Sequence, residues 1–194
     1  MFINKRILKR LMLKAYKGNG LYMGNYDGHI YLGEPFTASW MAKIAIGCVP
    51  REILATMVEC AGEIPQPEES WTSDRDGSQR ELFQRWSEPH GGTLADVTPV
   101  YVSSPGGDLF RAVQMQNCKI LYLRPEMLDA IDAGSIDREN QETMIEGPFY
   151  DGEGRLYART NQATWLIRGW APPRVQEITA ALEEKELKFD AQEG

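Results

Sequence analysis

The chain repeats one pattern three times, in which a short β-hairpin and a third strand precede a helix that begins at a proline. The three copies occupy residues 20–60, 99–133 and 147–184. Each unit is too small to bury its own apolar face, so neighbouring units must pack against one another. The pattern therefore predicts an α+β protein of repeated units, in which antiparallel sheets and helices share one hydrophobic interior.

Four segments predict helices. The first spans residues 5–17, where Asn4 is a suitable N-cap and Gly18 a suitable stop. The second runs from Pro50 to Gly62, the third covers residues 125–134, and the fourth follows the two prolines at 172–173. The residues expected to face the core in the second helix are Ile53, Leu54, Met57, Val58 and Ala61. Those expected to do so in the fourth helix are Val175, Ile178, Ala181 and Leu182.

The chain divides by composition into three parts. Residues 1–64 form the first unit and the start of the second, residues 65–96 form a linker or excursion, and residues 97–194 form the second half. The middle part is rich in Pro, Gly, Ser and charge, and we expect one short helix in it around residues 78–86. Such long loops are uncommon in compact domains, so this part is either a connection between units or a functional arm.

The charge of the chain is unevenly distributed. Its net value of −7 disfavours a protein that coats nucleic acid over its whole surface. The first 17 residues nevertheless hold six cations and no acid, which predicts a local basic surface on an acidic body. The three cysteines lack CxxC spacing and are typical of reduced core thiols. No apolar run is long enough to span a bilayer, so we expect a cytoplasmic protein without membrane contact.

Two segments carry a resemblance to a known family. CKILYLRPEMLDAIDAG, at residues 118–134, is similar to the opening strand and helix of the DNA sliding clamps. YDGEGRLYARTNQATWLIRGW, at residues 150–170, is similar to their hairpin, and YDGHIYLG followed by WMAKIAI repeats it in the first copy. The pattern most closely resembles the bacterial clamp that is the β subunit of the replicative polymerase. The chain departs from that pattern by the insertion in its second unit and by a fourth unit that ends after its helix.

The resemblance implies outer sheets, helices that face DNA, no catalysis, and self-association into rings. DNA in such a clamp is held by nonspecific attraction to its phosphates, which weakens with salt. Only the first helix has the charge for this role, and its DNA-binding candidates are Lys5, Arg6, Lys9, Arg10, Lys14 and Lys17. The same cations also fit a solvated helix surface, a protein docking face or contact with an anionic membrane.

A second candidate site lies in the middle part of the chain. Residues 79–83 resemble the loose form of the short peptide by which bacterial proteins dock on a sliding clamp. The partner-binding residues would be Gln79, Leu82 and Phe83. The two apolar residues of this peptide fit equally well in a small cluster that pins the segment to the body.

The sequence gives no sign of catalysis, a cofactor or a metal site. His29 and His90 have no histidine, cysteine or carboxylate neighbours at metal-ligand spacing. No nucleophile, base and orienting group can be named together. We therefore expect a non-enzymatic interaction protein with a sliding-clamp-like fold, DNA-associated in replication or a mobile element. The alternatives are a module that binds a protein or small ligand without DNA, and a small enzyme of undefined reaction.

Overall fold

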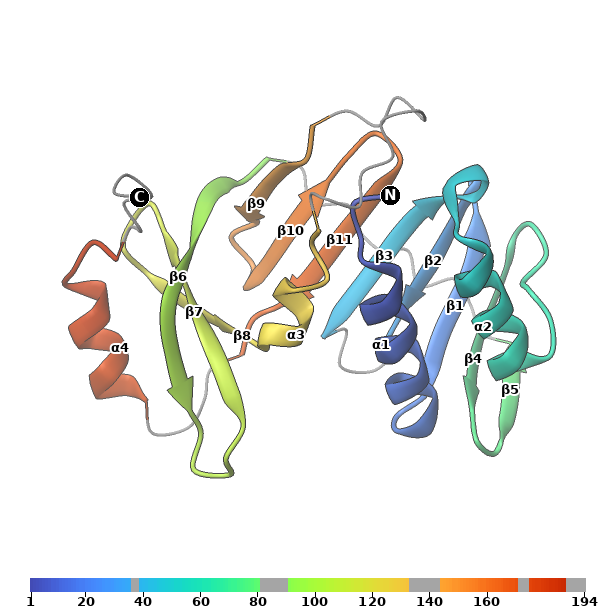
Figure 1. The fold of residues 1–194 in the computed structure, drawn as a ribbon, viewed down its shortest axis with the longest axis horizontal. Coiled ribbons are helices and arrows are strands. Elements are labelled where there is room, and N and C mark those ends of the chain that lie inside the picture. Colours follow the sequence, from blue (N-terminus) through green and yellow to red (C-terminus); the bar gives the residue numbers. More distant parts are fainter. Residues whose placement is uncertain (36–38, 81–90, 133–143, 171–174, 188–194) are drawn as a thin grey trace.

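The computed structural model describes residues 1–35, 39–80, 91–132, 144–170 and 175–187. The strands formed within these ranges are β1 (Leu21–Tyr26), β2 (His29–Gly33), β3 (Trp40–Ala45), β4 (Glu69–Asp74), β5 (Gly77–Arg80), β6 (Thr93–Ser103), β7 (Leu109–Met115), β8 (Ile120–Leu123), β9 (Glu146–Tyr150), β10 (Arg155–Arg159) and β11 (Ala163–Arg168). They join in one antiparallel sheet with the order β5-β4-β1-β2-β3-β11-β10-β9-β6-β7-β8 (Figure 1). The expected α+β class with antiparallel sheets is confirmed.

Helix α1 (Lys5–Lys17) packs beside α2 (Arg51–Ala61), and both cover the β1–β4 part of the sheet (Figure 1). Asn4 Oδ1 accepts hydrogen bonds from the backbone N–H groups of Arg6 and Ile7, at 3.0 and 3.3 Å. This cap satisfies N–H groups that the first helical turn leaves unpaired. The side chains that α1 buries are Leu8, Leu11, Met12 and Ala15. The predicted bounds and N-cap of α1 are confirmed.

A tight turn at Asp27 and Gly28 joins β1 to β2. Both residues have positive φ, 48° and 72°. Two positive φ values suit the right-handed twist of the flanking strands, and Asp-Gly adopts them more readily than most pairs. The Asp-Gly hairpin that the sequence predicts is therefore present, and its geometry follows from these two residue types.

The pairing of β3 with β11 joins the strands that precede residue 81 to those that follow residue 90. Trp40 of β3 and Trp165 of β11 stack at this seam, with ring centroids 5.6 Å apart, and both are fully buried. Trp165 also donates a hydrogen bond from Nε1 to the backbone oxygen of Met127, at 2.9 Å. The core is continuous across the seam, because the same apolar cluster contains residues of α1, β3, β11 and β7.

At the far end of the sheet, α4 (Gln176–Glu183) packs against β8 (Figure 1). The hydroxyls of Thr179 and Tyr122 lie 2.8 Å apart, and the backbone N–H of Ile120 donates to the carboxylate of Glu183 at 3.1 Å. The apolar cluster that contains Val175 is separate from the main core. In the part of the chain that the structure describes, no helix is long and apolar enough to cross a membrane.

The third and fourth helices differ from the sequence expectation. Helix α3 is a single turn, Pro125–Leu128, rather than a helix through residue 134. It ends early because the chain after it pairs with the N-terminus: the N–H of Asn4 donates to the oxygen of Ala130 at 2.8 Å, and Ile3 bridges Ile131. Ile178 and Ala181 of α4 were expected to face the core, but both are exposed, Ile178 to 49%.

The buried side of α2 also differs from the expected apolar stripe. The residues that it buries are Ile53, Thr56, Met57 and Cys60. Val58, expected to face the core, is 44% exposed. Thr56 can be buried because its hydroxyl donates to the backbone oxygen of Glu52 at 2.8 Å, which satisfies the polar group.

Part of the expected linker at residues 65–96 is β-structure. β4 pairs with β1, and β5 pairs with β4 at the edge of the sheet. Residues 78–80 therefore belong to a strand, so the helix expected around residues 78–86 is wrong there, while residues 81–86 lie outside the described ranges. β5 lies at the edge of the sheet, and most residues of both strands are polar, which explains why their hydrophobic pattern does not reveal them.

Candidate nucleic-acid interface and a polar pocket

The six cations that the sequence singles out are all exposed on α1. Residues three, four, seven and eleven positions apart share one side of a helix. One side of α1 therefore carries Arg6, Lys9, Arg10 and Lys17, with Leu13 among them. The residues that line a shallow hollow on this side are Arg6, Lys9, Arg10, Leu13, Lys14, Lys17 and Gly18. The structure thus brings five of the six predicted DNA-binding residues together around the apolar side chain of Leu13.

Two of the six cations pair with acids of neighbouring helices. Lys5 Nζ lies 3.2 Å from a carboxylate oxygen of Glu52 on α2, and Lys14 Nζ lies 2.7 Å from one of Glu126 on α3. Exposed pairs of this kind contribute about 0–1 kcal/mol each. The cations that have no ion pair with any residue of the described ranges are Arg6, Lys9, Arg10 and Lys17.

The second predicted site is only partly within the described ranges. Gln79 is exposed on the edge strand β5, where it pairs with Thr72 of β4. Leu82, Phe83 and His90 lie outside the described residues. The docking role of this peptide stays a prediction.

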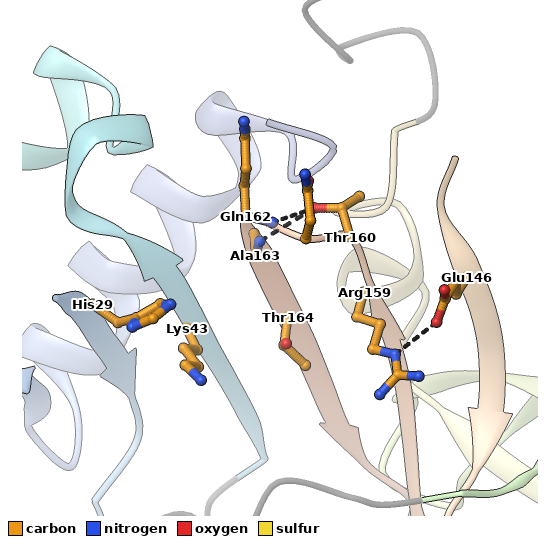
Figure 2. Close-up of a pocket in the computed structure, with 9 residues that line it drawn as sticks. His29, Lys43, Glu146, Arg159, Thr160, Gln162, Ala163 and Thr164 are labelled. Atoms are coloured by element: carbon orange, nitrogen blue, oxygen red, sulfur yellow. Dashed lines mark hydrogen bonds and ion pairs between the residues drawn. The ribbon is translucent and has the colours of Figure 1, made fainter. Parts of the chain in front are cut away.

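A polar pocket of about 350 Å³ lies where β2, β3, β11, β10 and β9 run side by side (Figure 2). Strand register places Lys43 opposite Thr164, Thr164 opposite Arg159, and Arg159 opposite Glu146. These residues therefore form one row across four strands. Lys43 and Thr164 alternate with the core residues Ala42 and Trp165, so the row faces away from α1.

The charged groups of the pocket are held by a few contacts. Arg159 Nε donates to Glu146 Oε2 at 2.7 Å. Lys43 Nζ lies 6.0 Å from the centre of the Tyr31 ring. Burial lowers the pKa of Lys43, while the nearby Asp27 carboxylate acts in the opposite direction.

The rim of the pocket is formed by a corner between β10 and β11. The Thr160 hydroxyl accepts hydrogen bonds from the backbone N–H groups of Gln162 and Ala163, both at 3.2 Å. On the opposite rim, His29 Nδ1 lies 2.7 Å from the backbone oxygen of Asp27. A carbonyl oxygen can only accept, so Nδ1 carries the hydrogen and His29 Nε2 is the nitrogen left for another contact.

Sequence reasoning missed the row of Lys43, Thr164 and Arg159. One signal was present, since Lys43 alternates with apolar residues in the strand WMAKIAI and must therefore point away from the core. The pairing of β3 with β11, which brings the three residues together, has no signal in the sequence.

The thiols and histidine of the described ranges form no recognisable catalytic or metal site. Cys60 is buried, while Cys48 and Cys118 are half-buried. Cys118 lies in the turn between β7 and β8 with a φ of 64°, not in the core as expected. Burial raises the pKa of the Cys60 thiol, which disfavours the nucleophilic thiolate. Within the described ranges, no three His, Cys, Asp or Glu side chains are grouped to hold a metal ion.

Several solved structures are distantly similar to this chain, among them two bacterial proteins. The β subunit of DNA polymerase III from Thermotoga maritima has 11% identity and a TM-score of 0.36, and the match covers 91% of this chain. A protein assigned as a DNA polymerase III β subunit from Eubacterium rectale has 8% identity and a TM-score of 0.39, over 90% of this chain. This chain spans 66% of the length of each. No protein-family model and no curated protein matches the sequence.

Proposed function

We propose that the protein is a non-enzymatic interaction protein that binds DNA through α1, in replication or in a mobile element. The observation that carries the proposal is the exposed basic side of α1. There, Arg6, Lys9, Arg10 and Lys17 have no ion pair within the described ranges. A surface of this kind attracts the phosphates of a nucleic acid without reading its bases.

The cost of these charges to the helix supports the proposal. Lys5 and Arg6 occupy the first turn of α1, where the helix dipole is positive and disfavours cations, and this turn holds no acid. Arg10 follows Arg6 by four residues, a spacing at which like charges repel. Arg6 and Arg10 therefore do not serve the stability of α1, and a bound polyanion would offset their repulsion.

The acidic remainder of the chain supports a single binding surface. The net charge is −7 despite the six cations of α1, so most other surfaces repel a polyanion. α1 also shares one face of the sheet with α2, and the sequence resemblance assigns such a helix-covered face to DNA. Self-association, which the same resemblance implies, can be measured by light scattering with and without DNA.

The test compares two matched pairs of substitutions on the full chain. Lys9→Gln/Lys17→Gln removes two cations from α1, and Lys119→Gln/Lys185→Gln removes two exposed cations from the other end of the molecule. Gln has nearly the helix propensity of Lys, so the helix is preserved. Fluorescence anisotropy with a short duplex is recorded over a range of salt concentrations.

We expect the α1 pair to weaken binding and to lower the slope of log K against log salt by about 2, since each phosphate contact contributes about 0.9. The control pair should leave the slope unchanged. Equal losses in both pairs, or no binding by the unaltered chain at low salt, would overturn the proposal.

A further inference from the structure

We propose that the row of Lys43, Thr164 and Arg159 binds the phosphate group of a small phosphorylated molecule. Figure 2 shows the three side chains extending to the same side of adjacent strands, with Thr164 in the middle. Neighbouring strands lie about 4.8 Å apart, so the two cations start roughly 10 Å apart and flank the hydroxyl. Both side chains are long enough to reach a group placed above Thr164.

The donors of the row suit a phosphate. Arg159 uses Nε for Glu146, and within the described ranges its two terminal nitrogens make no hydrogen bond. Guanidinium groups bind phosphate through such paired donors, while Lys43 adds a point charge and Thr164 a hydroxyl. A phosphate monoester presents three oxygens to these three groups, whereas a carboxylate presents only two. The row therefore favours phosphate over carboxylate ligands.

The acids beside the row set how tightly it can bind. Glu146 pairs with Arg159 on the exposed rim, and Asp27 acts on Lys43 from the turn between β1 and β2. An exposed ion pair contributes little, so an incoming phosphate can take the place of Glu146 beside Arg159. Burial disfavours the charged form of Lys43, and a bound anion would add to the Asp27 carboxylate in offsetting that cost. Weak but selective binding follows.

The size and place of the pocket indicate a small ligand distinct from DNA. Its volume of about 350 Å³ is at the lower end of the range for small-molecule sites. The row faces away from α1, so a ligand can occupy it while a nucleic acid contacts the helix. The site therefore does not depend on the function proposed above.

The test is a titration of the ¹⁵N-labelled full chain, followed by amide chemical shifts. The probes are inorganic phosphate, adenosine monophosphate, and acetate at matched ionic strength. We expect phosphate and the monophosphate to shift the amides of Lys43, Thr164 and Arg159 along saturating curves, and acetate to give no such curve.

Two substitutions with opposite expected effects distinguish binding from a structural role. Arg159→Gln should weaken binding about tenfold or more, since a hydrogen bond to a charged group contributes about 1.5–3 kcal/mol. Glu146→Gln removes the competing carboxylate and should tighten binding. Lys119→Gln, in the turn between β7 and β8, is the control for general charge and should change nothing. Equal binding of acetate, exclusion of the monophosphate, or equal effects of Arg159→Gln and Lys119→Gln would overturn the proposal.

Discussion

Trp40 and Trp165 have the same residue type and the same burial, but their indole nitrogens differ. Trp165 Nε1 donates to the backbone oxygen of Met127, whereas Trp40 Nε1 is buried and has no hydrogen-bond partner among the residues that the structure describes. The sequence does not distinguish the two residues, because the acceptor for Trp165 belongs to the distant turn α3.

We predict that Trp165→Phe destabilises the protein more than Trp40→Phe does. Both substitutions remove the same volume at the same seam, so the cavity cost is similar. Only Trp165→Phe leaves a buried carbonyl, that of Met127, without its donor, which costs about 1–3 kcal/mol. Urea unfolding of the two variants gives the difference, and equal midpoints would contradict the prediction.

The bounds of a helix or strand can be predicted from the sequence where neighbouring residues alone determine them. Helix α1 begins and ends where Asn4 and Gly18 predict, because caps and apolar spacing agree along its whole length. Helix α3 is shorter than its pattern suggests, since Ala130 and Ile131 pair with the N-terminal segment instead. β4 and β5 have weak patterns of their own and depend on pairing with β1. Tertiary contacts therefore decide these elements.

Helix α4 fully buries none of its own side chains and depends on its links to the sheet. The chain after it is held by Gln114 of β7, which is 4% exposed. Its Nε2 donates to the backbone oxygen of Lys185, and its Oε1 accepts from the N–H of Leu187, both at 2.7 Å. One buried amide thus fixes the chain after α4 by a reciprocal pair of hydrogen bonds.

We predict that Gln114→Leu loosens this end of the molecule without unfolding the rest. Losing two hydrogen bonds lowers the local opening free energy by about 1–3 kcal/mol, so the Leu187 amide should exchange about tenfold to hundredfold faster. Amide exchange of α1 should be unchanged. Gln116→Leu, an exposed neighbour on the same hairpin, is the control. Equal exchange in both variants would show that the amide does not hold the chain.

At the scale of the molecule, the two candidate sites differ in how far the sequence reveals them. The basic side of α1 is visible because its residues lie within one helix and share its period. The row in the pocket cannot be recognised in the sequence, because Lys43 and Arg159 come to flank Thr164 only when β11 pairs with both β3 and β10. Local periodicity identifies surfaces made by one element, whereas surfaces made by several elements depend on topology.

The seam between β3 and β11 should also make the sheet unfold as one unit. Ile167 of β11 is fully buried opposite Trp40, in the core cluster that also contains residues of α1 and β7. We predict that Ile167→Val costs about 0.5–1.5 kcal/mol. The urea concentration at the unfolding midpoint should fall equally for the amides of β1 and for those of β7. Amide exchange in urea measures both, with the half-exposed Ile178→Val as a control that shifts neither. A shift confined to one of the two strands would mean that the sheet consists of independently folding parts, because a shared core transmits the loss to both sides of the seam.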